Sequence, residues 1–148
     1  MICAFFGHKD SPESVRPLLE VAIRRIIEHY PDTTFYVGHN GNFDRMVLSV
    51  LKKLSAEITE LSYAVILAYL PTGKTAECYN GLPTIYPEGI ESVPKKYAIS
   101  YRNNRIVKQA DMIICYIIHD FGGAAQFVKK AENKGKIVYN VANLPFIR

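Results

Sequence analysis

The feature that most constrains the fold is a regular alternation of short apolar runs with longer segments of helical period. The apolar runs, which are rich in β-branched and aromatic residues, lie at residues 2–6, 33–37, 61–70, 111–118 and 137–141. Such runs are typical of strands buried on both faces. Strands that alternate with helices predict βαβ units and a parallel sheet. We therefore predict an α/β fold with three layers and a mostly parallel five-stranded sheet.

Four segments between these runs carry the apolar stripe of an amphipathic helix. The stripe of the first helix consists of Val15, Leu18, Leu19, Ala22, Ile23, Ile26 and Ile27. We predict that Ser11 caps this helix, that Pro12 is its first residue and that Pro31 ends it. The stripe of the second helix consists of Phe43, Met46, Val47, Val50, Leu51 and Leu54. The last two helices are predicted at 95–110 and 122–135.

Length and composition indicate one soluble domain over residues 1–148. The apolar fraction of 49% is enough for a core, and the charged fraction of 22% is ordinary. The net charge of +4 is spread along the chain, without the basic block that is typical of a nucleic-acid tail. We do not expect nucleic acid to be a partner. No apolar run reaches the roughly 18 residues needed to span a membrane, so we expect no membrane partner.

The cysteines indicate a reducing compartment. Cys3, Cys78 and Cys115 lie far apart, with no CxxC spacing, and Cys3 and Cys115 fall within predicted buried strands. An odd number of cysteines, two of them buried, is typical of a reduced protein. The first ten residues also lack the positive segment and the long apolar run of a secretory signal. We expect a cytoplasmic protein.

The segment 71–94 interrupts the alternation. It is rich in proline, shows no clear period and is predicted to be a long connection with a short helix near Glu88. Long irregular connections in compact domains are often functional.

Two of the predicted strands end in the same dipeptide. Gly7-His8 follows the first strand and Gly38-His39 follows the second, inside the stretch YVGHNGNFDR. Parallel α/β sheets bind ligands outside the carboxyl ends of their strands, and glycine lets a ligand approach the backbone. The pattern therefore predicts a binding site at this edge, although tight strand-to-helix turns would also explain the glycines.

Two further segments add polar groups to this edge. Gly122-Gly123 opens the last helix, whose first N–H groups favour an anion. Asn103 lies on the same predicted helical stripe as apolar residues such as Ile106, and a polar residue there needs a partner in a loop or a ligand. The neighbouring Arg102 carries a guanidinium group suited to phosphate or carboxylate, and the helical spacing places it off this stripe.

Several segments together resemble one known family. They are FFGHKD, GHNGNFDRMVLSVLKKL, TIYPEG, AISYRNNRIVKQADMIICYI and GGAAQFVKKAENKGKIVYNV. They resemble the SLOG superfamily, and within it the small YpsA-like proteins of bacteria and phages, over nearly the whole chain. The superfamily includes the Lonely Guy nucleotide hydrolases, the DNA-processing SMF proteins and sensors of nucleotide-derived signals. The resemblance implies a Rossmann-like fold and a nucleotide or ADP-ribose-like ligand.

The same resemblance places limits on catalysis. Lonely Guy enzymes pair an arginine with a glutamate that follows a PGGxGT loop, and Arg102 matches that arginine. The loop here is HDFGGAAQF, and Gln126 or Phe127 stands where the glutamate should be. Glutamine can neither take a proton nor stabilise an oxocarbenium ion with a full charge. The resemblance therefore implies that this chain binds its ligand as a sensor or binding module, without phosphoribohydrolase activity.

The predicted site combines these residues. The ligand-binding residues that we predict are Gly7, His8, Gly38, Asn40, Asp44, Arg102, Asn103, Gly122, Gly123 and Ala124. We predict no cofactor, and we expect a homo-oligomer. His8, His39 and His119 all follow strands and raise the alternative of a zinc site with Asp120, but no local ligand spacing supports one, so we predict no metal.

Two other functions remain open. Asp44, Glu88 and Asp120 are candidate catalytic carboxylates for a nucleotide N-glycosidase or a deoxyribosyltransferase-like transferase. The basic pI and the SMF relatives raise DNA binding as a second alternative, to which Lys129, Lys130, Lys134 and Lys136 would contribute.

Overall fold

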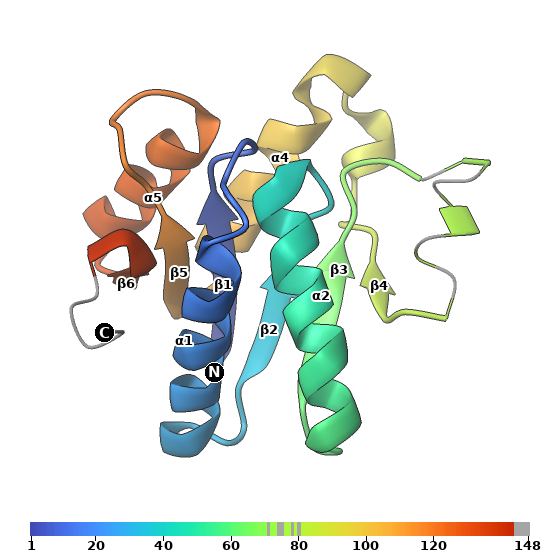
Figure 1. Cartoon of the computed structure of the whole chain (residues 1–148). Helices are drawn as coiled ribbons and strands as arrows, with labels where there is room; N and C mark the ends of the chain where they lie inside the picture. The colour runs from blue at the N-terminus through green and yellow to red at the C-terminus, as the bar shows by residue number, and fades with distance from the viewer. Residues whose placement is uncertain (71, 74–75, 78, 80, 144–148) are drawn as a thin grey trace.

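Six parallel strands form one sheet in the order β4-β3-β2-β1-β5-β6 (Figure 1). The computed structural model describes residues 1–70, 72–73, 76–77, 79 and 81–143. The strands are β1 Ile2–Gly7, β2 Thr34–Val37, β3 Ser62–Ile66, β4 Thr84–Ile85, β5 Met112–Tyr116 and β6 Ile137–Asn140. The helices are α1 Val15–His29, α2 Gly41–Glu57, α4 Lys95–Gln109 and α5 Gly123–Asn133, with 3₁₀ turns η1 Ile90–Ser92 and η2 Val141–Asn143. The α/β class and the three-layer arrangement are confirmed.

The prediction of five strands is wrong by one strand. β4 lies within the long connection and pairs with the end of β3, where Val65 is opposite Thr84. A strand of two exposed residues has too few positions to show a period of two. The sheet is also parallel throughout, because every described pairing is parallel. The short helix predicted near Glu88 is the 3₁₀ turn η1.

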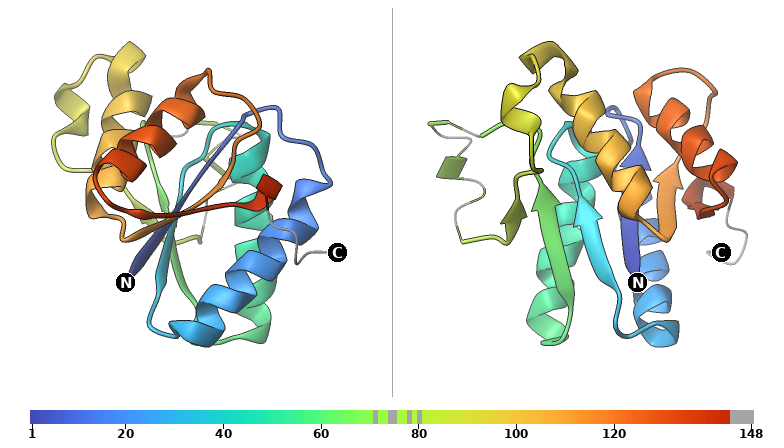
Figure 2. Two further views of the ribbon diagram at one scale, coloured as in Figure 1. Left: turned by 90° about the vertical axis from the view of Figure 1, so that its left-hand side faces the viewer. Right: turned by 180° about the vertical axis from the view of Figure 1, so that it is seen from behind.

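The helices cover both faces of the sheet. Helices α1 and α2 lie in front of the sheet in Figure 1, and α4 and α5 lie in front in the rear view of Figure 2. Cys3 and Phe5 of β1 point into the core beneath α1 and α2, whereas Ala4 and Phe6 point into the core beneath α4 and α5. This alternation explains why β1 and β5, in the middle of the sheet, are almost wholly apolar, since neither of their faces meets water.

The strand order reverses at β1. The chain adds β2, β3 and β4 on one side of β1, and then crosses back to add β5 and β6 on the other side. The carboxyl ends of the strands point to the upper edge in Figure 1, where α4 and α5 begin. Parallel sheets bind ligands at such a reversal, where the loops after neighbouring strands diverge.

The start of the first helix differs from the prediction. Helix α1 begins at Val15, and Ser11 lies four residues before it. The Ser11 hydroxyl donates to the carbonyl oxygen of His8 at 2.5 Å, and the Ser11 N–H donates to the same oxygen at 3.0 Å. Ser11 is buried and fixes the turn after β1 instead of capping the helix.

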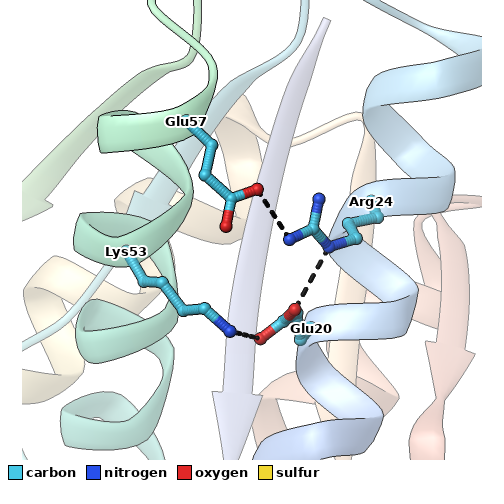
Figure 3. Close-up of polar contacts among 4 residues, drawn as sticks. All are labelled: Glu20, Arg24, Lys53 and Glu57. Atoms are coloured by element: carbon cyan, nitrogen blue, oxygen red, sulfur yellow. Dashed lines mark hydrogen bonds and ion pairs between the residues drawn. The ribbon is translucent and has the colours of Figure 1, made fainter.

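Charged side chains join the outer surfaces of α1 and α2 (Figure 3). Glu20 of α1 accepts from Arg24 at 3.1 Å and from Lys53 of α2 at 2.8 Å. Arg24 also donates to Glu57 of α2 at 2.8 Å. Exposed ion pairs each contribute less than about 1 kcal/mol, so the apolar contacts beneath them carry most of the helix packing.

Cys3 and Cys115 are buried as predicted, and burial raises the pKa of the Cys115 thiol to about 12. Cys78 lies outside the described residues. Within the described part of the chain, no helix is long and apolar enough to cross a membrane.

The close contact between β1 and α2 gives a first prediction. A Cβ added at Gly7 would lie 2.2 Å from the ring of Phe43, which is fully buried. We expect Gly7→Ala to lower the free energy of unfolding by about 1–3 kcal/mol, the usual cost of overpacking, in urea denaturation. Gly123→Ala is the control, because its Cβ would meet no atom within 4 Å. Equal free energies of unfolding of the two variants would contradict the close contact between position 7 and the ring of Phe43.

Candidate functional site

A pocket of about 510 Å³ lies at the carboxyl edge of the sheet. It is bounded by the turns after β1, β2 and β5, by one side of α4 and by the first turn of α5. All ten residues predicted to bind the ligand line it: Gly7, His8, Gly38, Asn40, Asp44, Arg102, Asn103, Gly122, Gly123 and Ala124. Segments far apart in the sequence thus meet in one cavity.

Arg102 is the buried charge of this pocket. It lies on α4, and only 2% of its surface is exposed. Its Nη1 donates to Asn40 Oδ1 at 2.6 Å, and its Nε donates to Asn103 Oδ1 at 3.0 Å. The prediction that Arg102 lies off the buried stripe of this helix is wrong, because Arg102 is more buried than Asn103. The partner of Asn103 is therefore the neighbouring arginine.

Gly38 allows two charged side chains to approach the end of β2. A Cβ added there would lie 2.7 Å from Asp44 Oδ2 and 3.1 Å from Arg102 Cζ. Burial raises the pKa of Asp44 to about 6, against the opposing effects of Arg102 and of the Asn40 N–H, which donates to Asp44 Oδ2 at 3.0 Å. Loss of hydration also lowers the pKa of Arg102, and Asp44 opposes that change.

Asn40 connects three sides of the pocket. It precedes α2, and its side-chain oxygen accepts from Arg102 on α4. Its side-chain nitrogen donates to the Tyr69 hydroxyl at 3.1 Å, beyond the end of β3. Its backbone N–H holds Asp44 in the first turn of α2. This amide therefore fixes the position of the guanidinium group relative to the sheet.

The two Gly-His dipeptides share a structural role. His8 Nε2 accepts the backbone N–H of Ile118, just beyond β5, at 3.1 Å. His39 Nε2 accepts the backbone N–H of Ala68, just beyond β3, at 2.9 Å. Each histidine therefore ties the end of its own strand to the end of the neighbouring strand. Burial lowers the pKa of both rings, that of His39 to about 4, and so keeps them neutral acceptors.

Three aromatic rings stack along one side of the pocket, and we call His8, His119 and Phe121 the ring stack. The His8 and His119 centroids are 3.7 Å apart, and so are those of His119 and Phe121. His119 and Phe121 line the pocket but are absent from the predicted ligand-binding residues. The position of Phe121 directly before Gly122-Gly123 is a sequence signal for Phe121, and no such signal marks His119.

The first turn of α5 lines the pocket through Gly122, Gly123 and Ala124. Gly122 has a φ of 94° and a ψ of 168°, a conformation that strongly favours glycine. The Gln126 N–H donates to the Gly122 carbonyl oxygen at the start of this helix. The N–H groups that precede Gln126 in the first turn have no partner within the helix. A Cβ at Gly123 would meet no atom within 4 Å. The turn is therefore open to an anion.

Only one of the three candidate catalytic carboxylates lies in the pocket. Asp44 lines it. Glu88 is exposed, and its carbonyl oxygen accepts from the Tyr101 hydroxyl. Asp120 lines a different hollow between α5 and β6. The structure therefore does not bring Asp44, Glu88 and Asp120 together.

The histidines do not converge on a metal position. Among the described residues, no group of three or more His, Cys, Asp or Glu side chains is arranged to hold a metal ion. The Nε2 atoms of His8 and His39 both accept backbone N–H groups, and His8 and His119 stack face to face.

The chain matches no known family model and no curated protein. Among solved structures it is similar to DNA processing protein A (DprA) from Streptococcus pneumoniae, with a TM-score of 0.65 and 12% sequence identity. The likeness covers 92% of this chain and 48% of that chain, so this chain spans about half the length of DprA. At this identity the likeness shows the fold alone, which is a DprA-like, Rossmann-like α/β fold.

The raised pKa of Asp44 gives a second prediction. Between its ordinary pKa and about 6, Asp44 binds more protons in the folded state than in the unfolded state. Its contribution to stability therefore falls as the pH rises through this window. We expect Asp44→Asn to raise the free energy of unfolding by about 1–3 kcal/mol at pH 8, and the gain to vanish near pH 4. Urea denaturation of both proteins across this range measures the difference.

Titration of the histidines also changes the free energy of unfolding with pH. This effect is the same in the wild type and in Asp44→Asn, so it drops out of the difference between them. A variant that is less stable than the wild type at pH 8 would contradict the prediction. It would mean that attraction to Arg102 outweighs the lost hydration of the Asp44 carboxylate.

Proposed function

We propose that the pocket binds a nucleotide or a nucleotide-derived ligand of the ADP-ribose type, and that the protein acts as a binding module or sensor. The observation that carries the proposal is the buried guanidinium group of Arg102, which lines the pocket and contacts two neutral amides. Burying a cation is costly unless it is paired and hydrogen-bonded. Asp44 supplies one negative charge near Arg102 when it is ionised, and a phosphate or carboxylate in the pocket would add a second one.

The first turn of α5 supports the same ligand class. Its backbone N–H groups and the positive end of the helix favour an anion. Arg102 and this turn belong to different elements and line one pocket, so a ligand with separated anionic groups would contact both. The pocket volume of about 510 Å³ lies within the range for small-molecule and cofactor sites.

Hydrolysis of the ligand is the second candidate function, and Asp44 is the observation that favours it. Its pKa of about 6 would suit a proton donor or acceptor near neutral pH. Gln126, however, is exposed and stands near the place of the glutamate in the resembling hydrolases. We therefore prefer binding without turnover. The YpsA-like branch stays a prediction, as does a homo-oligomer.

DNA is a third candidate, because the fold resembles that of a DNA-processing protein. Lys129, Lys130 and Lys134 are exposed on or just after α5, as the alternative requires. Lys130, however, donates to Asn104 and lies over the Phe127 ring. We keep the preference for a small ligand, and a salt-dependent gel shift of single-stranded DNA would reverse it.

A third prediction tests the anion site. Gly123→Val would place a branched side chain in the open approach to α5, where no neighbouring atom clashes with the new Cβ. We expect calorimetry to show at least tenfold weaker binding of AMP and of ADP-ribose, with an unchanged melting temperature. The matched control is Gln126→Val, which introduces the same side chain at an exposed position of α5 outside the pocket. Equal affinities in both variants and the wild type would exclude this turn as the anion site.

A fourth prediction separates binding from turnover. Incubation of the wild type with AMP should release no adenine above background, because Gln126 stands near the place of the glutamate in the resembling hydrolases and neither Glu88 nor Asp120 joins Asp44 in the pocket. Chromatography of the free base is the measurement, with Asp44→Asn as the control. Release of adenine that the Asp44→Asn variant abolishes would establish a nucleotide N-glycosidase.

A further inference from the structure

The exposed end of the ring stack points to how the ligand's base is recognised. We propose that Phe121 is a platform on which a planar aromatic heterocycle, such as a purine, stacks when its ribose phosphate occupies the pocket. The inference rests on the function proposed above. It explains how the base would be recognised, whereas Arg102 and the first turn of α5 would contact only the anionic groups.

The exposure of Phe121 is the first observation. The ring lines the pocket, yet 67% of the residue's surface is exposed. One face stacks on His119 with an interplanar angle of 12°. The opposite face therefore points away from the stack. Aromatic rings are favoured partners for nucleobases, because every base offers a π-face.

The support beneath Phe121 is the second observation. His119 stacks on His8, which is buried and tied to the Ile118 N–H. The His8 carbonyl oxygen in turn accepts from Ser11. His119 also contacts the platform through its Nδ1, which lies 3.0 Å from the Phe121 carbonyl oxygen. The platform is thus held in place before the ligand arrives, which reduces the entropy lost on binding.

The position of Phe121 along the chain is the third observation. It lies two residues before Gly123, so the platform and the anion site belong to one loop and line one pocket. A single nucleotide would then contact both through its base and its phosphate. Stacking selects a flat ring and not a particular pattern of hydrogen bonds, so the proposal specifies an aromatic base without naming one.

The test compares AMP with ribose 5-phosphate, which lacks the base, on the full chain. We expect the wild type to bind AMP at least tenfold more tightly than ribose 5-phosphate, because stacking contributes this much for one base. Phe121→Leu should abolish the difference by weakening AMP binding alone. Phe121→Tyr should retain it. In NMR spectra the wild type should shift the H2 and H8 protons of AMP upfield through the ring current, and Phe121→Leu should not.

Ile118→Ala is the matched control. Ile118 is 63% exposed on the same loop, and its side chain does not line the pocket. The control should bind both probes like the wild type, and all variants should keep the wild-type melting temperature.

Five outcomes would overturn the platform. Equal affinity of the wild type for the two probes, or unchanged AMP binding by Phe121→Leu, would refute it and leave the proposed function standing. If Phe121→Leu lost the same affinity for AMP and for ribose 5-phosphate, Phe121 would only maintain the shape of the loop. A dimer that dissociates in Phe121→Leu during sedimentation would assign the exposed ring to a contact between copies. If neither probe binds the wild type, the proposed function fails together with the platform.

Discussion

The buried guanidinium group of Arg102 is the interaction on which the rest of the pocket depends. Its bond to Asn40 joins α4 to the start of α2, its bond to Asn103 lies within α4, and Asn40 extends the connection to Tyr69. Gly38 is required at the end of β2 because any side chain there would overlap Asp44 and crowd Arg102. A buried cation thus limits which residue types are possible at the positions around it.

The two Gly-His dipeptides show how the loops at a sheet edge are held together. Strand ends expose backbone N–H groups that no longer have a partner strand. His8 and His39 satisfy two of these groups from neighbouring strands, at Ile118 and Ala68. Their pKa values are lowered by burial, which keeps the rings neutral and able to accept. The loops at this edge are therefore cross-linked in pairs, and the pocket between them has a fixed floor.

Most of the fold follows from local patterns in the sequence, and so does the position of the pocket. The stripes of α1 and α2 and the apolar strands are predictable because every residue on a period contributes to the pattern. The two-residue strand β4 offers no such repetition, and it exists through pairing with β3. The prediction that Arg102 lies off the buried stripe of α4 is wrong because helical spacing predicts burial only for apolar residues. Its burial depends on Asn40, which is 62 residues away in the sequence.

The ring stack was not predictable for a related reason. His119 and Phe121 lie on a loop, where no period distinguishes a solvated side chain from a stacked one. Their arrangement depends on His8, which directly follows β1, a strand that is next to β5 in space but distant from it in sequence. Sequence analysis of a parallel sheet can therefore locate the edge at which side chains meet. It cannot determine which of them contact one another, because those contacts form between loops that the strand order brings together.

The structural likeness to DprA concerns the backbone and not the side chains. A TM-score of 0.65 at 12% identity means that the two chains share a path of the backbone with few shared side chains. A parallel sheet with helices on both faces hosts many functions, and the side chains at its carboxyl edge determine which one. In this chain that edge carries a buried arginine, a glycine-opened helix and an exposed aromatic ring around one cavity. We base the proposal of a small anionic ligand with an aromatic base on those groups, because proteins track a nucleic-acid backbone with clustered surface cations instead.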